Sequence, residues 1–261
     1  MGHGNSVGLF DNGITPFVID CGTRDTDKES NFFNLIMTSL RKHSTRDLVI
    51  SHYHFDHYSL INKFPFNFFD NIYVPALPPQ SRSANVIYQF LSVATVLAFR
   101  NYSLTPIITK YGKRICPLVK GDLFNAMNRE WEVLWPDYEV VDRINRRKIN
   151  RIQSEIEKIV EELDPNDREA FEKTYGTLTR AFSKKEKREE QILLPNISLE
   201  KETDDRFNEP LRKIEGGFKT LANSVSLVIR DSFADFLFLI SSLDVFENQF
   251  KTFALMHACM S

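Results

Sequence analysis

The segment at residues 51–57, Ser-His-Tyr-His-Phe-Asp-His, constrains the fold of this chain more than any other feature. It follows a short apolar run that predicts a buried strand. Side chains two residues apart in an extended chain point the same way, so we expect His52 and His54 to bind one ion together. Asp56 and His57 follow as the chain turns, and we expect them to face a second ion. Imidazoles and a carboxylate suit zinc, with manganese or iron as alternatives, and we expect one or two ions.

The alternative interpretation of this segment is a chance cluster of surface histidines. The whole chain has six histidines among 261 residues, and three of them fall within six consecutive positions. Such clustering is improbable by chance, so we favour a metal site.

Composition restricts the class of protein. Apolar residues make up 42% and charged residues 26% of the chain, which predicts a sizeable core and excludes wholesale disorder. The length fits one large domain, or one domain with an insertion. The net charge of −2 gives no global basic field for nucleic acid, although a local basic groove is compatible with it.

Cysteine usage and hydropathy predict a cytoplasmic protein with no membrane association. No signal peptide is visible, and the most apolar run, residues 86–99, is shorter than the about 20 residues that span a bilayer. The cysteines are far apart and form no Cys-x-x-Cys pair, which favours buried thiols in a reducing compartment. They are Cys21, Cys116 and Cys259.

The pattern His-x-His-x-Asp-His after a strand resembles the signature of the metallo-β-lactamase-fold hydrolases. This resemblance implies an α/β fold, an αββα sandwich with a one- or two-metal site at the sheet ends. The glycine-rich segment 2–8 and the strand Pro16–Gly22 are similar to one branch, which contains the hydrolase domain of bacterial DNA-uptake (competence) proteins. In that branch Asp20 is implied to hold the histidine loop by hydrogen bonds. The alternative is an ordinary aspartate that caps the turn after a strand.

We expect three parts in the chain. Residues 1–140 form the N-terminal half of the sandwich with the metal loop, residues 141–213 a helical hairpin insertion, and residues 214–261 the return to the core. Apolar residues at helical spacing predict the hairpin, and Asp164-Pro165 predicts a break and a new helix start. The hairpin is either a lid or arm that holds a substrate or protein partner, or a solvated insertion of mixed charge, which we favour.

Two later residues complete the metal set that the resemblance implies. Asp244 follows a predicted strand where the branch has Thr-Gly-Asp, although Ser242-Leu243 replaces Thr-Gly. His257 fits the first histidine of a His-His-Gly-Ser segment, and the residues after it do not fit. A middle histidine is missing between His57 and Asp244. The family sandwich normally continues beyond this point, so we expect it to be incomplete at the C-terminus, divergent, or lacking one metal.

The resemblance implies a metal-dependent hydrolase that uses a metal-activated hydroxide. His52 and His54 are implied to hold the first ion, and Asp56, His57 and His257 the second. Asp244 would bridge the two ions, and Asp56 would also act in catalysis by orienting the hydroxide. The branch favours a phosphodiesterase or nuclease with nucleic acid as substrate. The alternatives are a hydrolase of small esters, thioesters or lactones, and a truncated, inactive protein that binds a partner through its helical insertion.

Overall fold

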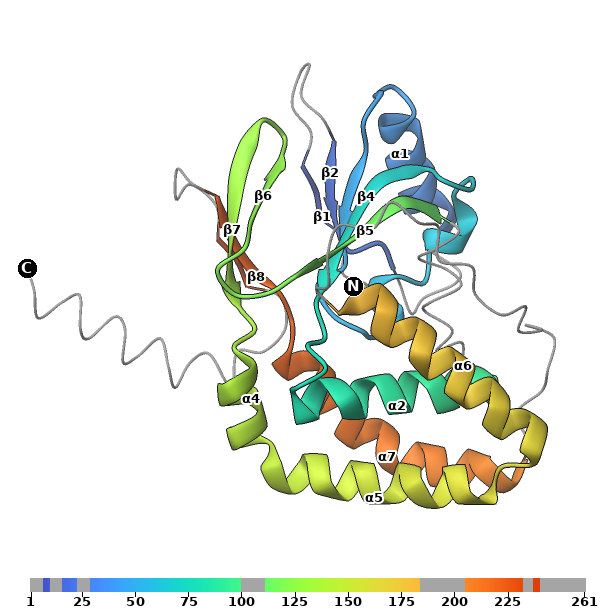
Figure 1. Ribbon diagram of the computed structural model, residues 1–261. Coiled ribbons are helices and arrows are strands. Elements are labelled where there is room, and N and C mark those ends of the chain that lie inside the picture. The colour runs from blue at the N-terminus through green and yellow to red at the C-terminus, as the bar shows by residue number, and fades with distance from the viewer. Residues whose placement is uncertain are drawn as a thin grey trace, which may run out of the picture.

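The computed structural model describes residues 7–9, 16–22, 29–99, 111–183, 205–231 and 237–239. Two β-sheets stand side by side above a layer of helices (Figure 1). The first sheet is mixed and has the strand order β1-β2-β3-β4-β5, in which β1 runs antiparallel to β2 and the other neighbours are parallel. Its strands are β1 Val7–Leu9, β2 Phe17–Ile19, β3 Asp47–Val49, β4 Phe69–Pro75 and β5 Gly112–Leu118.

The second sheet is antiparallel throughout, in the order β6-β7-β8-β9. A two-residue turn joins its first two strands, and both turn residues, Met127 and Asn128, have positive φ, as a tight hairpin of matching twist requires. The strands are β6 Leu123–Ala126, β7 Arg129–Trp135, β8 Val228–Asp231 and β9 Leu237–Leu239.

The two sheets pack through one hydrophobic cluster. Phe17 of β2 lies 5.2 Å from Trp131 of β7, measured between ring centroids, and Val49 of β3 joins the same cluster. The alternate residues Val18 and Leu48 join instead the larger cluster that includes the buried face of helix α1 (Glu29–Leu40). This alternation follows from the two-residue period of a strand. The predicted α/β class is therefore confirmed, while the metallo-β-lactamase topology stays a prediction.

The helical layer surrounds α2, which contacts the four other helices of the layer, α4, α5, α6 and α7. Phe90 of α2 stacks on Phe218 of α7 at 4.0 Å between ring centroids. Isoleucines of α5 are buried at helical spacing in the main hydrophobic cluster, so this region is part of the core and not a solvated arm. The helices are α2 Arg82–Val96, α4 Tyr138–Ile144, α5 Arg146–Glu162, α6 Pro165–Phe182 and α7 Asp205–Ser224. Within the described ranges, no helix has the length and apolarity needed to cross a bilayer.

One predicted boundary is confirmed, and the predicted boundaries around α7 are wrong. The break between α5 and α6 lies where it was predicted, with Asp164 accepting hydrogen bonds as the cap of α6. The segment 223–229, Asn-Ser-Val-Ser-Leu-Val-Ile, predicts a strand from its apolar residues, but β8 begins only at Val228 because α7 continues to Ser224. The boundary expected at residues 213/214 therefore falls inside α7, and the adjacent Gly216-Gly217 does not end this helix. The division into three parts otherwise stays a prediction.

Candidate metal centre

The candidate centre lies at the edge of the first sheet where the parallel strands β2 and β3 both end. Asp20 follows β2 and donates its backbone N–H to Val49 of β3 at 2.7 Å, and Ser51 and His52 follow β3. Parallel strands present their carboxyl ends along one sheet edge, which is where α/β proteins place their ligand sites. The histidine segment therefore starts from a rigid element.

The chain then turns back on itself through a 3₁₀ turn, η2 (Phe55–His57), and packs on the segment after β2. The backbone N–H of Cys21 donates to the carbonyl of His57 at 2.7 Å. A Cβ on Gly22 would lie 2.8 Å from the backbone nitrogen of Tyr58, and closer still to the carbonyl group of Asp56. Only glycine permits this backbone approach, so Gly22 holds His57 close to the strand end.

Three histidines converge at this edge. One ligating nitrogen from each of His52, His54 and His57 lies within 4.8 Å of the other two. The rings of His52 and His57 are 3.8 Å apart between centroids, and those of His52 and His54 are 4.3 Å apart. All three side chains are buried, with exposed fractions of 0%, 7% and 3% for His52, His54 and His57. This cluster could hold a metal ion.

Asp20 holds the cluster from behind. Its φ of 58° places it in the left-handed region, which aspartate tolerates better than most residues. Its carboxylate accepts hydrogen bonds from the backbone N–H and the hydroxyl of Ser51, both at 2.7 Å, and from Nδ1 of His57 at 2.7 Å. The expectation that Asp20 supports the histidine loop agrees with these contacts.

The hydrogen-bond network assigns the tautomers of the three rings. Nε2 of His54 donates to the carbonyl of Lys219 at 2.9 Å, so its Nδ1 keeps a lone pair. The hydroxyl hydrogen of Ser51 goes to Asp20, so Ser51 accepts from Nδ1 of His52 at 2.9 Å, and Nε2 of His52 keeps a lone pair. Because His57 donates from Nδ1 to Asp20, its Nε2 also carries a lone pair.

This assignment leaves Nε2 of His52 and Nδ1 of His54 facing each other at 2.9 Å with lone pairs on both atoms. Such a contact is repulsive unless a proton or a cation lies between the nitrogens. Burial lowers the pKa of His52 well below its usual value, with His57 adding to the effect. Burial also lowers the pKa of His54 to about 4, with His57 again adding. Both rings are therefore neutral near pH 7, as metal ligands must be, and the donor set fits a divalent cation.

Helix α7 covers the centre from the helical layer. Besides the Lys219 carbonyl that orients His54, Phe218 lies 6.4 Å from the His54 ring between centroids. The backbone N–H of Leu227, just after α7, donates to the carbonyl of Ser51 at 2.8 Å. A carbonyl that accepts from the far nitrogen of a ligating histidine is the usual way to fix such a ring. Sequence reasoning missed this contact because a backbone carbonyl has no sequence signature.

The other predicted site residues have different outcomes. Asp56 lies half-buried in η2, outside the group of three histidines, and its negative charge acts on His54 to oppose the fall in pKa. Its roles as ligand and catalytic residue stay predictions. His57, expected at a second ion, lies in one group with His52 and His54. The expected ligands Asp244 and His257 lie outside the described residues.

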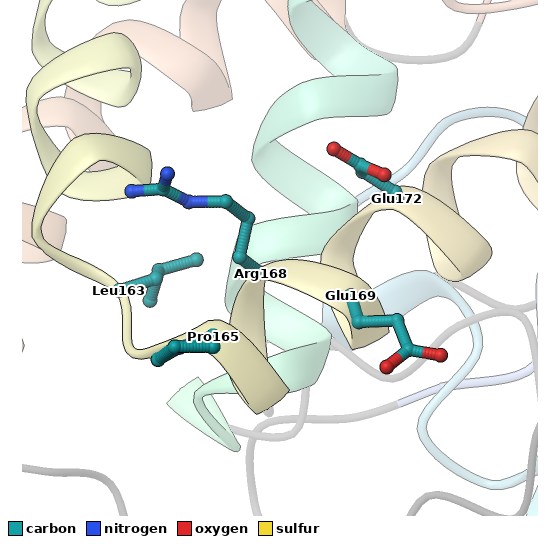
Figure 2. Close-up of a pocket in the computed structure, with 5 residues that line it drawn as sticks. All are labelled: Leu163, Pro165, Arg168, Glu169 and Glu172. Carbon is teal, nitrogen blue, oxygen red and sulfur yellow. The ribbon is translucent and has the colours of Figure 1, made fainter.

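A cavity elsewhere in the structure is not part of this centre. It lies at the turn between α5 and α6 and is lined by residues of that turn and of the first part of α6 (Figure 2). Its arginine, Arg168, donates to the carbonyls of Val160 and Glu161, which lie at the end of α5. One guanidinium nitrogen of Arg168 therefore caps the end of α5.

Comparison with known proteins adds no family assignment, because no family model matches the chain and no similar curated protein was found. The resemblance carried by the histidine motif therefore remains an expectation, and the geometry of the centre has to support any function.

Proposed function

We propose that this chain is a metal-dependent hydrolase, and specifically a phosphodiesterase or nuclease. The observation that carries the proposal is the convergence of three buried histidines, each with a ligating nitrogen within 4.8 Å of the other two. A chance group of histidines would not have each ring fixed by its own partner. Here Asp20 fixes His57, and the carbonyl of Lys219 fixes His54.

Each residue has a distinct part in this proposal. Nε2 of His52, Nδ1 of His54 and Nε2 of His57 would hold the cation, and zinc suits imidazole ligands best. A bound divalent cation lowers the pKa of water towards 7 and stabilises negative charge on a phosphoryl oxygen. Asp20 keeps the hydrogen of His57 on Nδ1, so that Nε2 remains a ligand. A carboxylate oxygen of Asp56, beside the cluster, would accept the proton of the attacking water.

A set of three histidine ligands would suit a catalytic centre. Structural zinc sites use four protein ligands, whereas catalytic sites use three and leave a position for water or substrate. The described part of the chain brings three histidines together. Three nitrogen ligands with a carboxylate nearby are the composition that a hydrolytic site requires.

A binding protein without catalysis is the second candidate. The observation that favours it is burial, since His52 is fully buried and His57 nearly so. Substrate would have to approach beside His54 and the half-buried Asp56, which are the more exposed members of the segment. Turnover therefore decides between the two candidates.

The test measures metal content and hydrolysis on the same samples. We expect the zinc-loaded protein to hold a stoichiometric amount of metal and to hydrolyse bis(p-nitrophenyl) phosphate. His54→Ala should lose both properties, whereas His43→Ala, at a histidine after α1 that is not in the cluster, should keep both. Unchanged metal content in His54→Ala would refute the site. Full metal content without hydrolysis of phosphodiesters, esters, thioesters or lactones would favour the binding protein.

A further inference from the structure

Helices α4 and α5 meet at a corner of the helical layer (Figure 1), and exposed arginines lie there. Arg143 lies near the end of α4, Arg146 and Arg147 begin α5, and all three are exposed. Arg82, at the start of α2, is also exposed and donates from its guanidinium to Asn150 of α5 at 2.6 Å. We call Arg82, Arg143, Arg146 and Arg147 the arginine corner.

Arginines outnumber the carboxylates at this corner. Within the described ranges, Arg143, Arg146 and Arg147 form no ion pair. The nearby carboxylate of Asp142 accepts from the backbone N–H groups of Arg82 and Ser83, so it caps the start of α2 and offsets part of the positive charge. Glu139 on α4 is exposed and, among the same described residues, forms no ion pair with an arginine of the corner.

Lysines elsewhere in the helical layer behave differently. Lys158, Lys173 and Lys213 are exposed, and each forms an ion pair with a glutamate three or four residues away on its own helix. Their charges are compensated locally, as is usual for helix surfaces. The absence of ion pairs at Arg143, Arg146 and Arg147 in the described residues is therefore a local property and not a general feature of these helices.

Local electrostatics opposes placing these charges here. Cations at the start of a helix face the positive end of its dipole, and neighbouring cations repel one another. The first turn of α5 has no acidic residue, and the cap residue Asn145 makes no side-chain capping bond to it. Its amide donates instead to Val141 and Ser224. An anionic partner would remove this unfavourable repulsion.

We infer that the arginine corner binds the phosphate backbone of a nucleic acid strand. This inference deepens the proposed phosphodiesterase function and rests on it for the identity of the substrate. Guanidinium groups form two parallel hydrogen bonds with a phosphate, which makes arginine better suited than lysine to this contact. Four guanidiniums spread over α2, α4 and α5 match successive phosphates of a strand better than one small anion.

The corner is connected to the metal centre through α7. Asn145, between Arg143 and Arg146, contacts Ser224 in the last turn of α7, and His54 contacts Lys219 of the same helix. Five residues separate these two contact points, which is roughly 7.5 Å along a helix axis. The corner and the histidine cluster therefore both adjoin the C-terminal half of α7.

Fluorescence anisotropy of a labelled single-stranded DNA oligonucleotide tests this inference. The protein is kept metal-free with EDTA so that cleavage does not interfere, and sodium chloride is varied between about 50 and 200 mM. Removing three phosphate contacts in R143Q/R146Q/R147Q should weaken binding at least about tenfold at the lowest salt. The slope of log K against log salt should become less steep by about 2, because each contact on a single strand contributes roughly 0.7.

The matched control is K158Q/K173Q/K213Q, which removes the same charge from the same helical layer but at paired positions. It should bind like the wild type, and thermal melting should show both variants folded. No binding by the wild type, or equal loss in the control, would overturn the inference. Binding to phosphatidylserine vesicles in place of the oligonucleotide would also overturn it.

The two proposals can fail separately. Oligonucleotide binding that depends on the arginines, without phosphodiester hydrolysis by the zinc-loaded protein, would support the corner and contradict the proposed function. Hydrolysis of bis(p-nitrophenyl) phosphate by a protein that does not bind the oligonucleotide would support the function and overturn the corner.

Discussion

Replacing Asp20 with asparagine should weaken metal binding with little change in shape. Asparagine tolerates the positive φ at this position and has the same size as aspartate. One carboxylate oxygen of Asp20 accepts from both the Ser51 hydroxyl and Nδ1 of His57, each at 2.7 Å. An amide NH₂ in its place is a donor, so His57 would have to accept at Nδ1 and carry its hydrogen on Nε2.

The same change reaches a second ligand. The Ser51 hydroxyl would turn its hydrogen towards Nδ1 of His52, 2.9 Å away, which moves the His52 hydrogen to Nε2. Two of the three ligating nitrogens would then carry hydrogens that the metal must displace. Mutations of such supporting groups typically cost 10–100-fold in metal affinity. We therefore expect Asp20→Asn to weaken the free energy of zinc binding by about 1.4–2.7 kcal/mol. We favour the upper end because two of the three rings are affected.

Competition between the protein and a chromogenic zinc chelator measures this loss. The control is Asp70→Asn, at a carboxylate that also accepts a backbone N–H but pairs with Lys113, away from the histidines. This control should bind zinc like the wild type. Equal zinc affinity for Asp20→Asn and wild type would refute the tautomer assignment on which the account of the centre depends.

Three further predictions concern stability, measured by urea unfolding. Gly22→Ala should lower the free energy of unfolding by about 2–3 kcal/mol, because its Cβ would meet backbone atoms. Gly216→Ala, where a Cβ would have nothing within 4 Å, should instead raise it by about 0.5–1 kcal/mol. Equal effects of the two changes would contradict the close approach at Gly22. Tyr53→Phe should lower the free energy of unfolding by about 1–3 kcal/mol, because the fully buried hydroxyl donates to the backbone carbonyl at the end of β4. Tyr175→Phe removes a partly buried hydroxyl and should lower it less. The free energy of unfolding of the metal-free protein should fall by about 3 kcal/mol as pH falls from 6.5 towards 4. The reason is that the pKa of His54 is about 6.5 in the unfolded chain and about 4 in the folded protein, so only the unfolded chain takes up the proton over this range. A His54→Gln protein should lose less over this range, and an equally steep loss would exclude His54 as the cause.

The local part of the centre could be predicted from the sequence. An extended chain places His52 and His54 on one side and Tyr53 on the other, and the structure has this arrangement. The strand before them followed from its apolar residues. These two inferences use only neighbouring residues and the two-residue period of a strand. The support by Asp20 was implied by the family resemblance and not by the local pattern, since Asp20 contacts Ser51 across 31 residues.

The long-range part could not be predicted. His57 meets His52 because the chain turns back over Gly22, and that approach depends on backbone packing between segments more than thirty residues apart. The carbonyl of Lys219 reaches His54 across 165 residues and involves no side chain of Lys219. Neither contact leaves a pattern of residue types in the sequence.

The misplaced start of β8 has a related cause. The pair Gly216-Gly217 suggests a break because glycine is a poor helix former. The buried face of α7, with Ile214, Phe218 and Leu221, packs in the main cluster and outweighs that local preference. Tertiary packing, and not propensity, therefore decides where this helix ends.

X-ray absorption spectroscopy of the zinc-loaded protein tests the central claim most directly. We predict a first shell of nitrogen and oxygen ligands at about 2.0–2.1 Å, with the multiple scattering of three imidazoles. The imidazole contribution should fall by one ring in His57→Ala, because that ring belongs to the same group. Zinc bound without imidazole scattering, or no stoichiometric zinc, would contradict the account.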